Sequence, residues 1–187
     1  MNPIFAAALE VERVVQAAGF RFCFIGGVAV QRWGQPRMTA DVDLTVITGF
    51  GGEAPYVDAL LGSFRGRISD ARAFALDHRT LLLLASNGVA IDIALGAMPF
   101  EERSVERASQ FVISGRESIT TCSAEDLVVH KAFAGRDKDW GDLRGILVRQ
   151  ARLDQELIWS ELLPLLELRE DSTTETKLRG LFASIGS

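Results

Sequence analysis

Cysteine, histidine and lysine are scarce in this chain, which has two cysteines, two histidines and three lysines among its 187 residues. Cys23 and Cys122 lie far apart in separate apolar runs, a spacing that indicates neither a zinc cluster nor a disulfide framework. The longest uncharged apolar runs fall far short of the ~20 residues that a membrane-spanning helix needs. We therefore expect a cytoplasmic protein with reduced core thiols and no membrane partner.

Positive charge is limited as well. The 20 basic residues are outnumbered by 25 acidic ones, and the formal net charge is −5. A protein that binds nucleic acid through the phosphate backbone needs a positive field to release counterions, so general DNA binding is not expected. Because 48% of the residues are hydrophobic, the chain can bury the core of one domain, or of one domain with an appended subdomain.

The periodicity of the apolar residues changes near residue 122. Before that point, predicted helices alternate with predicted strands, and Asn87-Gly88 marks a hairpin turn. Ser123 then begins a helix in the manner of a capping box, and the pattern up to Gly186 is almost entirely helical. The sequence thus predicts an α/β (α+β) fold in residues 1–122 and a helical subdomain in residues 123–187. The expected helices before residue 122 are 3–18, 28–33, 54–63 and 99–109, and the expected strands are 20–25, 41–47, 80–85, 89–95, 111–114 and 118–121.

Three aspartates stand out on the predicted strands. Asp41 and Asp43 are two residues apart, so they point to the same face, with Cα atoms ~7 Å apart. Asp92 is flanked on its own face by two alanines, which leave space around the carboxylate. If the two strands are neighbours, each pair of carboxylates at ~5 Å repels by about 3 kcal/mol. A cation would relieve this repulsion, and ligands that are all oxygen favour Mg²⁺ or Mn²⁺.

The Asp-x-Asp pair has other interpretations when it is taken alone. It is also found at solvent-facing strand edges and in turn caps, in sugar-nucleotide glycosyltransferases and in metal-dependent phosphohydrolases. A glycosyltransferase predicts a nucleotide-sugar subdomain before the motif, and only 40 residues precede Asp41. The discriminating feature lies upstream of the pair.

Two glycines, Gly26 and Gly27, stand between a predicted strand and a predicted helix. Glycine permits a tight turn and close backbone approach, and the first N–H groups of the following helix can bind an anion. The pair fits neither the G-x-G-x-x-G fingerprint of dinucleotide folds nor the P-loop, so both are disfavoured. A glycine pair alone is weak evidence for phosphate binding.

The combined motif is more specific. Gly26-Gly27, thirteen further residues and then Asp41-Val42-Asp43, with Arg37-x-Thr39 between them, resembles the signature of the DNA polymerase β-like nucleotidyltransferase superfamily, especially its small bacterial AbiEii/MNT-type members. The segment 125–143 resembles the second conserved region of that family, a lysine-bearing helix followed by Arg-x-x-Asp-x-x-Asp. Gly27 stands where the more common form of the motif has serine. The glycine therefore lacks a hydroxyl that contacts phosphate in the family.

This resemblance implies a fold and a reaction. The fold is a nucleotidyltransferase-type mixed sheet flanked by helices, with the catalytic core in residues 1–122 and a helical subdomain in 123–187 that completes the nucleotide site. The reaction is a Mg²⁺-dependent transfer (Mn²⁺ being possible) of NMP from an NTP such as ATP to an acceptor, with release of pyrophosphate. In the resembled branches the acceptor is a tRNA end, a side chain of a partner protein or a small molecule such as an aminoglycoside.

The resemblance also assigns roles to residues of this chain. Asp41, Asp43 and Asp92 are the expected catalytic residues and metal ligands. The expected nucleotide-binding residues are Gly26, Gly27, Arg37, Lys131, Asp139 and Asp142. The alternative function is a nucleotide-binding toxin–antitoxin component that acts through protein association without transfer.

Simpler interpretations of the nucleotide-binding residues remain open. Lys131 lies in an apolar helical stripe, where a lysine either extends its ammonium to solvent or meets an anion such as a triphosphate. Asp139 and Asp142 either form surface salt bridges with Arg136 or position Lys131. Arg37 is either solvated or in contact with phosphate. Thr39 simply caps the loop before the first aspartate.

Overall fold

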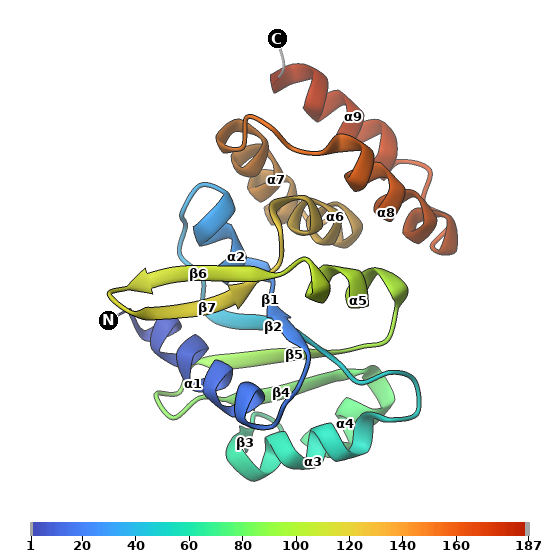
Figure 1. The fold of residues 1–187 in the computed structure, drawn as a ribbon. Coiled ribbons are helices and arrows are strands. Elements are labelled where there is room, and N and C mark those ends of the chain that lie inside the picture. Colours follow the sequence, from blue (N-terminus) through green and yellow to red (C-terminus); the bar gives the residue numbers. More distant parts are fainter. Residues whose placement is uncertain (1, 186–187) are drawn as a thin grey trace. The chain divides into compact units, whose positions relative to one another are not determined.

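The computed structural model describes residues 2–185, and these form a seven-stranded mixed sheet and nine helices (Figure 1). The fold class predicted from the sequence is confirmed. None of the helices within residues 2–185 combines the length and apolar character that a membrane span requires. The helices are α1 (Pro3–Ala17), α2 (Gly26–Trp33), α3 (Glu53–Ser63), α4 (Ala71–His78), α5 (Pro99–Glu106), α6 (Ala124–Ala134), α7 (Asp137–Arg149), α8 (Gln155–Leu168) and α9 (Thr174–Ile185). The strands are β1 (Phe22–Phe24), β2 (Asp41–Ile47), β3 (Arg65–Gly66), β4 (Thr80–Leu84), β5 (Ala90–Gly96), β6 (Ser109–Ser114) and β7 (Glu117–Thr121).

The chain divides into two compact units. Unit 1 comprises Met1–Val28 and Met38–Cys122, and unit 2 comprises Ala29–Arg37 and Ser123–Ser187. This division differs from the expected one in residues 29–37, because most of α2 and the loop after it pack with the C-terminal helices. The helical prediction for 123–186 holds as far as Ile185, and residues 186–187 lie outside the described part of the chain.

Unit 1 contains the whole sheet, in the order β3-β4-β5-β2-β1-β7-β6. Strand β2 runs parallel to β5, and β1 runs parallel to β7, whereas the other pairs are antiparallel. The Asn87-Gly88 turn joins β4 to β5 as predicted, with Gly88 at φ 84°. The β6–β7 hairpin, yellow in Figure 1, lies at one edge of the sheet.

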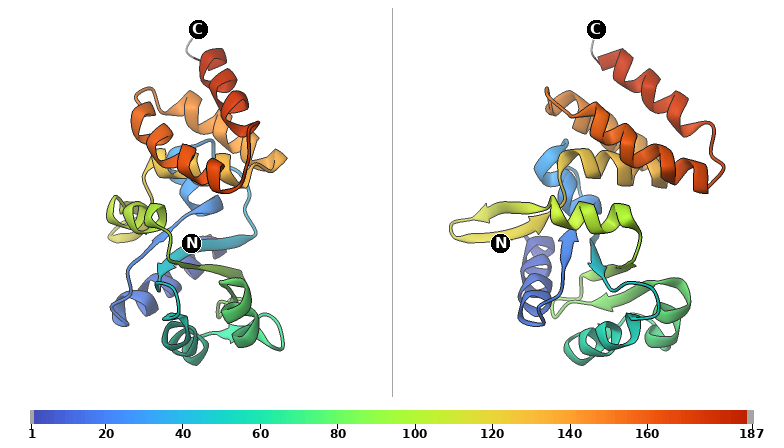
Figure 2. Two further views of the ribbon diagram at one scale, coloured as in Figure 1. Left: turned by 90° about the vertical axis from the view of Figure 1, so that its right-hand side faces the viewer. Right: turned by 45° about the vertical axis from the view of Figure 1, so that its right-hand side comes forward.

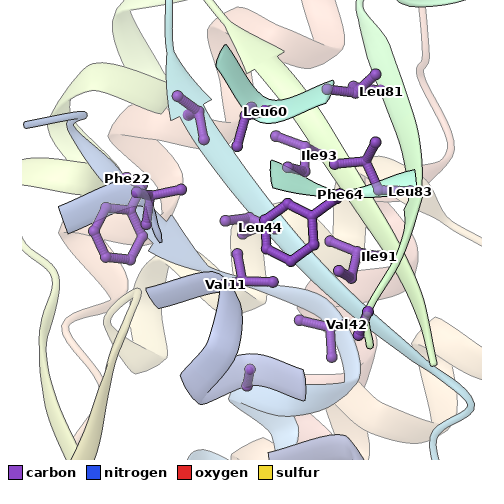
Figure 3. Close-up of a cluster of buried hydrophobic side chains, with 14 of the residues drawn as sticks. Val11, Phe22, Val42, Leu44, Leu60, Phe64, Leu81, Leu83, Ile91 and Ile93 are labelled. Carbon is purple, nitrogen blue, oxygen red and sulfur yellow. The ribbon is translucent and has the colours of Figure 1, made fainter. Parts of the chain in front are cut away.

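The core of unit 1 lies on one face of this sheet. Because side chains alternate along a strand, Val42 and Leu44 are fully buried on the face opposite to the aspartates of β2. Figure 3 shows their side chains together with those of Ile91 and Ile93 from β5. Helices α1, α3 and α4 contribute buried residues to the same cluster. The core therefore fixes which face of the sheet carries the acidic side chains.

Unit 2 is built around helix α6, which contacts α7, α8 and α9. Figure 2 shows these C-terminal helices, coloured from yellow through orange to red, packed against one another. Ser123 caps α6 by accepting a hydrogen bond from the Asp126 N–H at 3.0 Å, as the capping-box prediction expects. Arg149 and Gln150 donate hydrogen bonds to the main-chain oxygens of residues 34 and 33, which attaches the end of α2 to α7.

The structure also contains two elements that the sequence pattern did not predict. Strand β3 has two residues, which is too short for an alternation of apolar and polar residues to be visible. Helix α4 has eight residues, and the side chain of its N-cap residue, Asp70, makes no capping hydrogen bond. Helix α2 begins two residues earlier than predicted, at Gly26, so both glycines belong to its first turn.

A matched pair of valine substitutions tests the assigned core face. Val42→Ala on β2 removes two buried methyl groups and should lower the free energy of unfolding by about 2 kcal/mol. Val112→Ala on β6 makes the same chemical change at a side chain that is 64% exposed, and should cost less than half as much. Urea unfolding followed by circular dichroism measures both, and equal losses would contradict the assignment of the core face.

Candidate active site

The three aspartates predicted as metal ligands come together in unit 1. Strands β2 and β5 are parallel neighbours, and their register places Asp43 directly opposite Asp92. Asp41 lies two residues before Asp43 on the same face. One carboxylate oxygen from each of the three lies within 4.8 Å of the others, and all three residues are half-buried. The condition on which the metal site depends, that the two strands are neighbours, is therefore met.

The donor set of this carboxylate triad fits a divalent cation that prefers oxygen. Three carboxylates at such short separation repel one another, and Mg²⁺ and Mn²⁺ take oxygen ligands. Gly26 leaves space for the Asp43 carboxylate, since a Cβ atom at position 26 would lie 2.0 Å from Asp43 Oδ2. The residues present thus fit the magnesium or manganese ion that the sequence predicted.

Three further groups contact the triad. Arg67 lies with one guanidinium nitrogen 2.7 Å from Asp92 Oδ1. The Thr39 hydroxyl donates to Asp41 Oδ1 at 3.0 Å, and the Gly27 N–H donates to Asp43 Oδ2 at 3.4 Å. Burial raises the pKa of Asp92, the positive charge of Arg67 lowers it, and the negative charge of Asp41 raises it, with a net upward shift. Each carboxylate is therefore held by a different donor.

The structure explains why glycine, and not serine, stands at position 27. A Cβ atom on Gly27 would lie 2.2 Å from Thr39 Oγ1 and 2.8 Å from Thr39 Cβ, which is closer than real contacts allow. Thr39 thus occupies the space that a side chain at position 27 would need. Gly26 has a different constraint, because its φ of +56° at the start of α2 is rarely adopted by residues with a side chain.

The other predicted residues form a separate cluster of charges within unit 2. Lys131 Nζ lies 2.9 Å from Asp139 Oδ1 and 2.7 Å from Asp142 Oδ2. Arg37 donates two hydrogen bonds to Asp142, at 2.6 and 2.8 Å, and Arg136 donates to Asp139 at 2.6 Å. Lys131 and the two aspartates are buried. The alternating order of this charge cluster is Arg37, Asp142, Lys131, Asp139, Arg136.

These contacts bear on the interpretations that the sequence left open. Asp139 and Asp142 are buried partners of Lys131, and Asp139 also forms the expected salt bridge with Arg136. Arg37 is paired with Asp142. Burial raises the pKa of Asp139 and Asp142, but the hydrogen bonds and charges of the basic partners outweigh it, so that both pKa values lie below their ordinary value.

The sequence pattern missed one residue and undervalued another. Arg67 follows strand β3, in a segment for which the pattern predicted nothing, and two strand residues give no alternation that would reveal its direction. Thr39 was expected only to cap the loop, but it also contacts Asp41 and limits the residue at position 27. A polar residue two positions before a predicted metal ligand is the one local signal for Thr39.

Comparisons with known proteins found a matching family model and solved structures that are similar to this chain. The family model described as "Nucleotidyl transferase AbiEii toxin, Type IV TA system" matches residues 9–183. An antigenic nucleotidyltransferase-like protein from Paracoccidioides brasiliensis has a TM-score of 0.51 and 16% identity, covering 93% of this chain and 91% of that chain. The antibiotic-resistance factor ANT(2'')-Ia has a TM-score of 0.48 and 15% identity, covering 96% of this chain and 90% of that chain. No protein with a curated description matches the chain.

Substitution of Gly27 tests the contact with Thr39. Gly27→Ala should destabilise the protein, although alanine in an open helical position is more favourable than glycine by about 0.5–1 kcal/mol. Gly180→Ala in α9 is the matched control, because a Cβ atom there meets nothing within 4 Å, and this change should raise the melting temperature. Gly27→Ala combined with Thr39→Gly should recover the stability that Gly27→Ala loses. Thermal melts of the four proteins would contradict the contact if Gly27→Ala stabilised.

The charge cluster of unit 2 predicts a pH-dependent loss of stability. Because the pKa of Asp142 is lowered on folding, its contribution is complete above its ordinary value of 3.8 and disappears as the pH falls through the lowered value. Asp142→Asn should therefore cost about 3 kcal/mol near neutral pH, and this difference from the unsubstituted protein should shrink below pH 3.8.

The matched control for that experiment is Asp77→Asn in α4, whose side chain is 80% exposed. Its offset from the unsubstituted protein should stay small at every pH, because an exposed ion pair such as that of Asp77 with His78 contributes little to stability. Denaturant unfolding at a series of pH values measures both differences. A pH-independent offset for Asp142→Asn would show that its carboxylate is not stabilised by the basic partners.

Proposed function

The chain belongs to the AbiEii nucleotidyltransferase toxin family, and from this premise we propose that it transfers an NMP from an NTP to an acceptor, with release of pyrophosphate, in a reaction that depends on Mg²⁺ or Mn²⁺. The observation that carries the proposal is the convergence of three carboxylate oxygens within 4.8 Å beside the glycine pair that begins α2. Oxygen ligands of this kind hold the divalent ions used in phosphoryl transfer.

In this proposal Asp41, Asp43 and Asp92 hold the divalent ions. A bound ion would neutralise charge on the transferred phosphoryl group and on the leaving pyrophosphate. An acceptor oxygen forms the new bond to the α-phosphorus, and the bond from that phosphorus to the β-phosphate oxygen breaks with its electron pair. Asp92 is also the candidate base for the acceptor proton, since a carboxylate is one of the side chains that accept protons in such reactions.

The charge cluster is the proposed contribution of unit 2 to nucleotide binding. Lys131 Nζ has three N–H donors, of which Asp139 and Asp142 engage two, so that a third is available to a phosphate oxygen. The two aspartates hold the ammonium in place, and Arg37 fixes Asp142 in turn. Gly26 and Gly27 supply the main-chain approach at the start of α2, where the helix dipole favours an anion.

The proposal is tested with purified protein, Mg²⁺ or Mn²⁺, and each of the four NTPs labelled on the α-phosphate. Three classes of acceptor are offered: tRNA, protein side chains and an aminoglycoside. We expect label transfer and pyrophosphate release with one class, and a loss of about 10²-fold or more in rate with Asp43→Asn and Asp92→Asn. Asp77→Asn on an exposed helix face is the matched control and should retain full activity.

Two results would contradict this function. Transfer that persists in both aspartate variants would show that the carboxylates do not carry the reaction. A protein that transfers nothing to any acceptor class, yet binds a partner protein equally well with and without Asp43→Asn, would favour the alternative in which the chain acts by association.

A further inference from the structure

Arg67 lies in the same row of the sheet as two of the three carboxylates. Its main-chain N–H donates to the carbonyl oxygen of Leu82 on β4 at 2.9 Å. Leu82 is paired with Asp92 on β5, and Asp92 is paired with Asp43 on β2. The backbone of Arg67 is therefore held two strands away from Asp92, at the same level of the sheet.

The Arg67 side chain crosses β4 and reaches the triad. Strands are spaced about 4.8 Å apart, so the side chain has to extend over one whole strand to contact Asp92. It does so, with a guanidinium nitrogen 2.7 Å from Asp92 Oδ1, and both side chains are 31% exposed. The pairing of the strands, and not the sequence next to Arg67, therefore places this side chain against Asp92.

The chemistry of the site sets Arg67 against a metal ion. The Arg67 guanidinium contacts one oxygen of Asp92, a carboxylate that holds a divalent cation in the proposed function. The guanidinium and the cation therefore compete for the negative charge of Asp92. A nucleotide bound to the same cation brings phosphate oxygens into the immediate surroundings of Asp92. Arginine recognises phosphate with a planar, two-pronged set of N–H donors, whereas a carboxylate whose charge is neutralised by a metal ion attracts the guanidinium less.

We propose that Arg67 is a nucleotide-binding residue that pairs with Asp92 until a divalent cation takes this carboxylate, and then turns to a phosphate group of the metal-bound nucleotide. The inference rests on the proposed function, because it assumes a nucleotide and a metal at the triad. Its main-chain bond to Leu82 fixes the pivot, while the partly exposed side chain has the rotatable bonds needed to turn. Metal and nucleotide then bind with positive coupling, since each favours the same position of Arg67.

The test measures binding and not turnover. Mn²⁺ binding is followed by electron paramagnetic resonance, first alone and then with an ATP analogue that carries a methylene group between the α- and β-phosphorus atoms. Arg67→Ala should bind Mn²⁺ alone roughly two- to fivefold more tightly, because a competing partly exposed ion pair is gone. The same variant should bind the analogue in the presence of Mn²⁺ about tenfold more weakly or worse, because a charged phosphate contact is lost.

The matched control is Arg72→Ala, which removes an arginine from another exposed ion pair of unit 1, with Asp58 at 2.7 Å. It should change neither affinity. Arg67→Lys keeps the charge but not the planar fork, so Mn²⁺ affinity should return to that of the unsubstituted protein and analogue affinity only in part. In an Asp92→Asn background, Arg67→Ala should no longer strengthen Mn²⁺ binding.

The possible outcomes separate this inference from the function on which it rests. If the unsubstituted protein binds Mn²⁺ and the analogue, and Asp43→Asn weakens both, but Arg67→Ala changes neither affinity, then the role of Arg67 is overturned and the proposed function stands. If Arg67→Ala weakens both affinities together while its thermal melt is unchanged, Arg67 supports the metal site and does not exchange partners, which also overturns the inference. If the unsubstituted protein binds neither probe, both proposals fail.

Discussion

The parallel pairing of β2 with β5 is the constraint on which the candidate site depends. The register is enforced from the other face of the sheet, where Val42, Ile91 and Ile93 are fully buried. A shift of one residue would turn Ile91 and Ile93 toward the carboxylate face and Asp92 into the apolar core. Several buried apolar side chains therefore oppose any register except the one that brings Asp43 and Asp92 together. The stability of the core and the geometry of the acidic site are consequences of the same alternation.

That arrangement holds three like charges at close range, and the surrounding groups reduce the cost. Arg67, the Thr39 hydroxyl and the Gly27 N–H each contact a different carboxylate. These donors neutralise the carboxylates less than a metal ion would. One of them, Arg67, has a long side chain with several rotatable bonds. A carboxylate has two acceptor oxygens, so the triad with these partners still has oxygens to offer a cation. The same groups limit the sequence, since Thr39 leaves space only for glycine at position 27.

The local pattern of apolar and polar residues predicted the helices and strands that have one strongly apolar face over several residues. Both ends of β2 were predicted correctly because Asp41–Ile47 alternates without interruption, and the β4–β5 hairpin followed from its Asn-Gly turn. The order of the strands was not available from such signals, because pairing between β2 and β5 joins segments that are far apart in the chain. Residues 29–37 illustrate the same limit, since their membership of unit 2 depends on packing against α7. Arg67 was missed for this reason too.

The charge cluster of unit 2 shows why lysine suits position 131 in a chain that uses arginine almost everywhere. Lys131 is buried between Asp139 and Asp142, each of which already accepts hydrogen bonds from an arginine. A guanidinium at position 131 would be the third in the cluster, and it would need more donors satisfied in that buried space than a compact ammonium does. With two arginines, one lysine and two aspartates, the cluster carries a net charge of +1 in a chain whose total is −5. Overall acidity thus says little about the affinity for phosphate, because the position of each charge decides it.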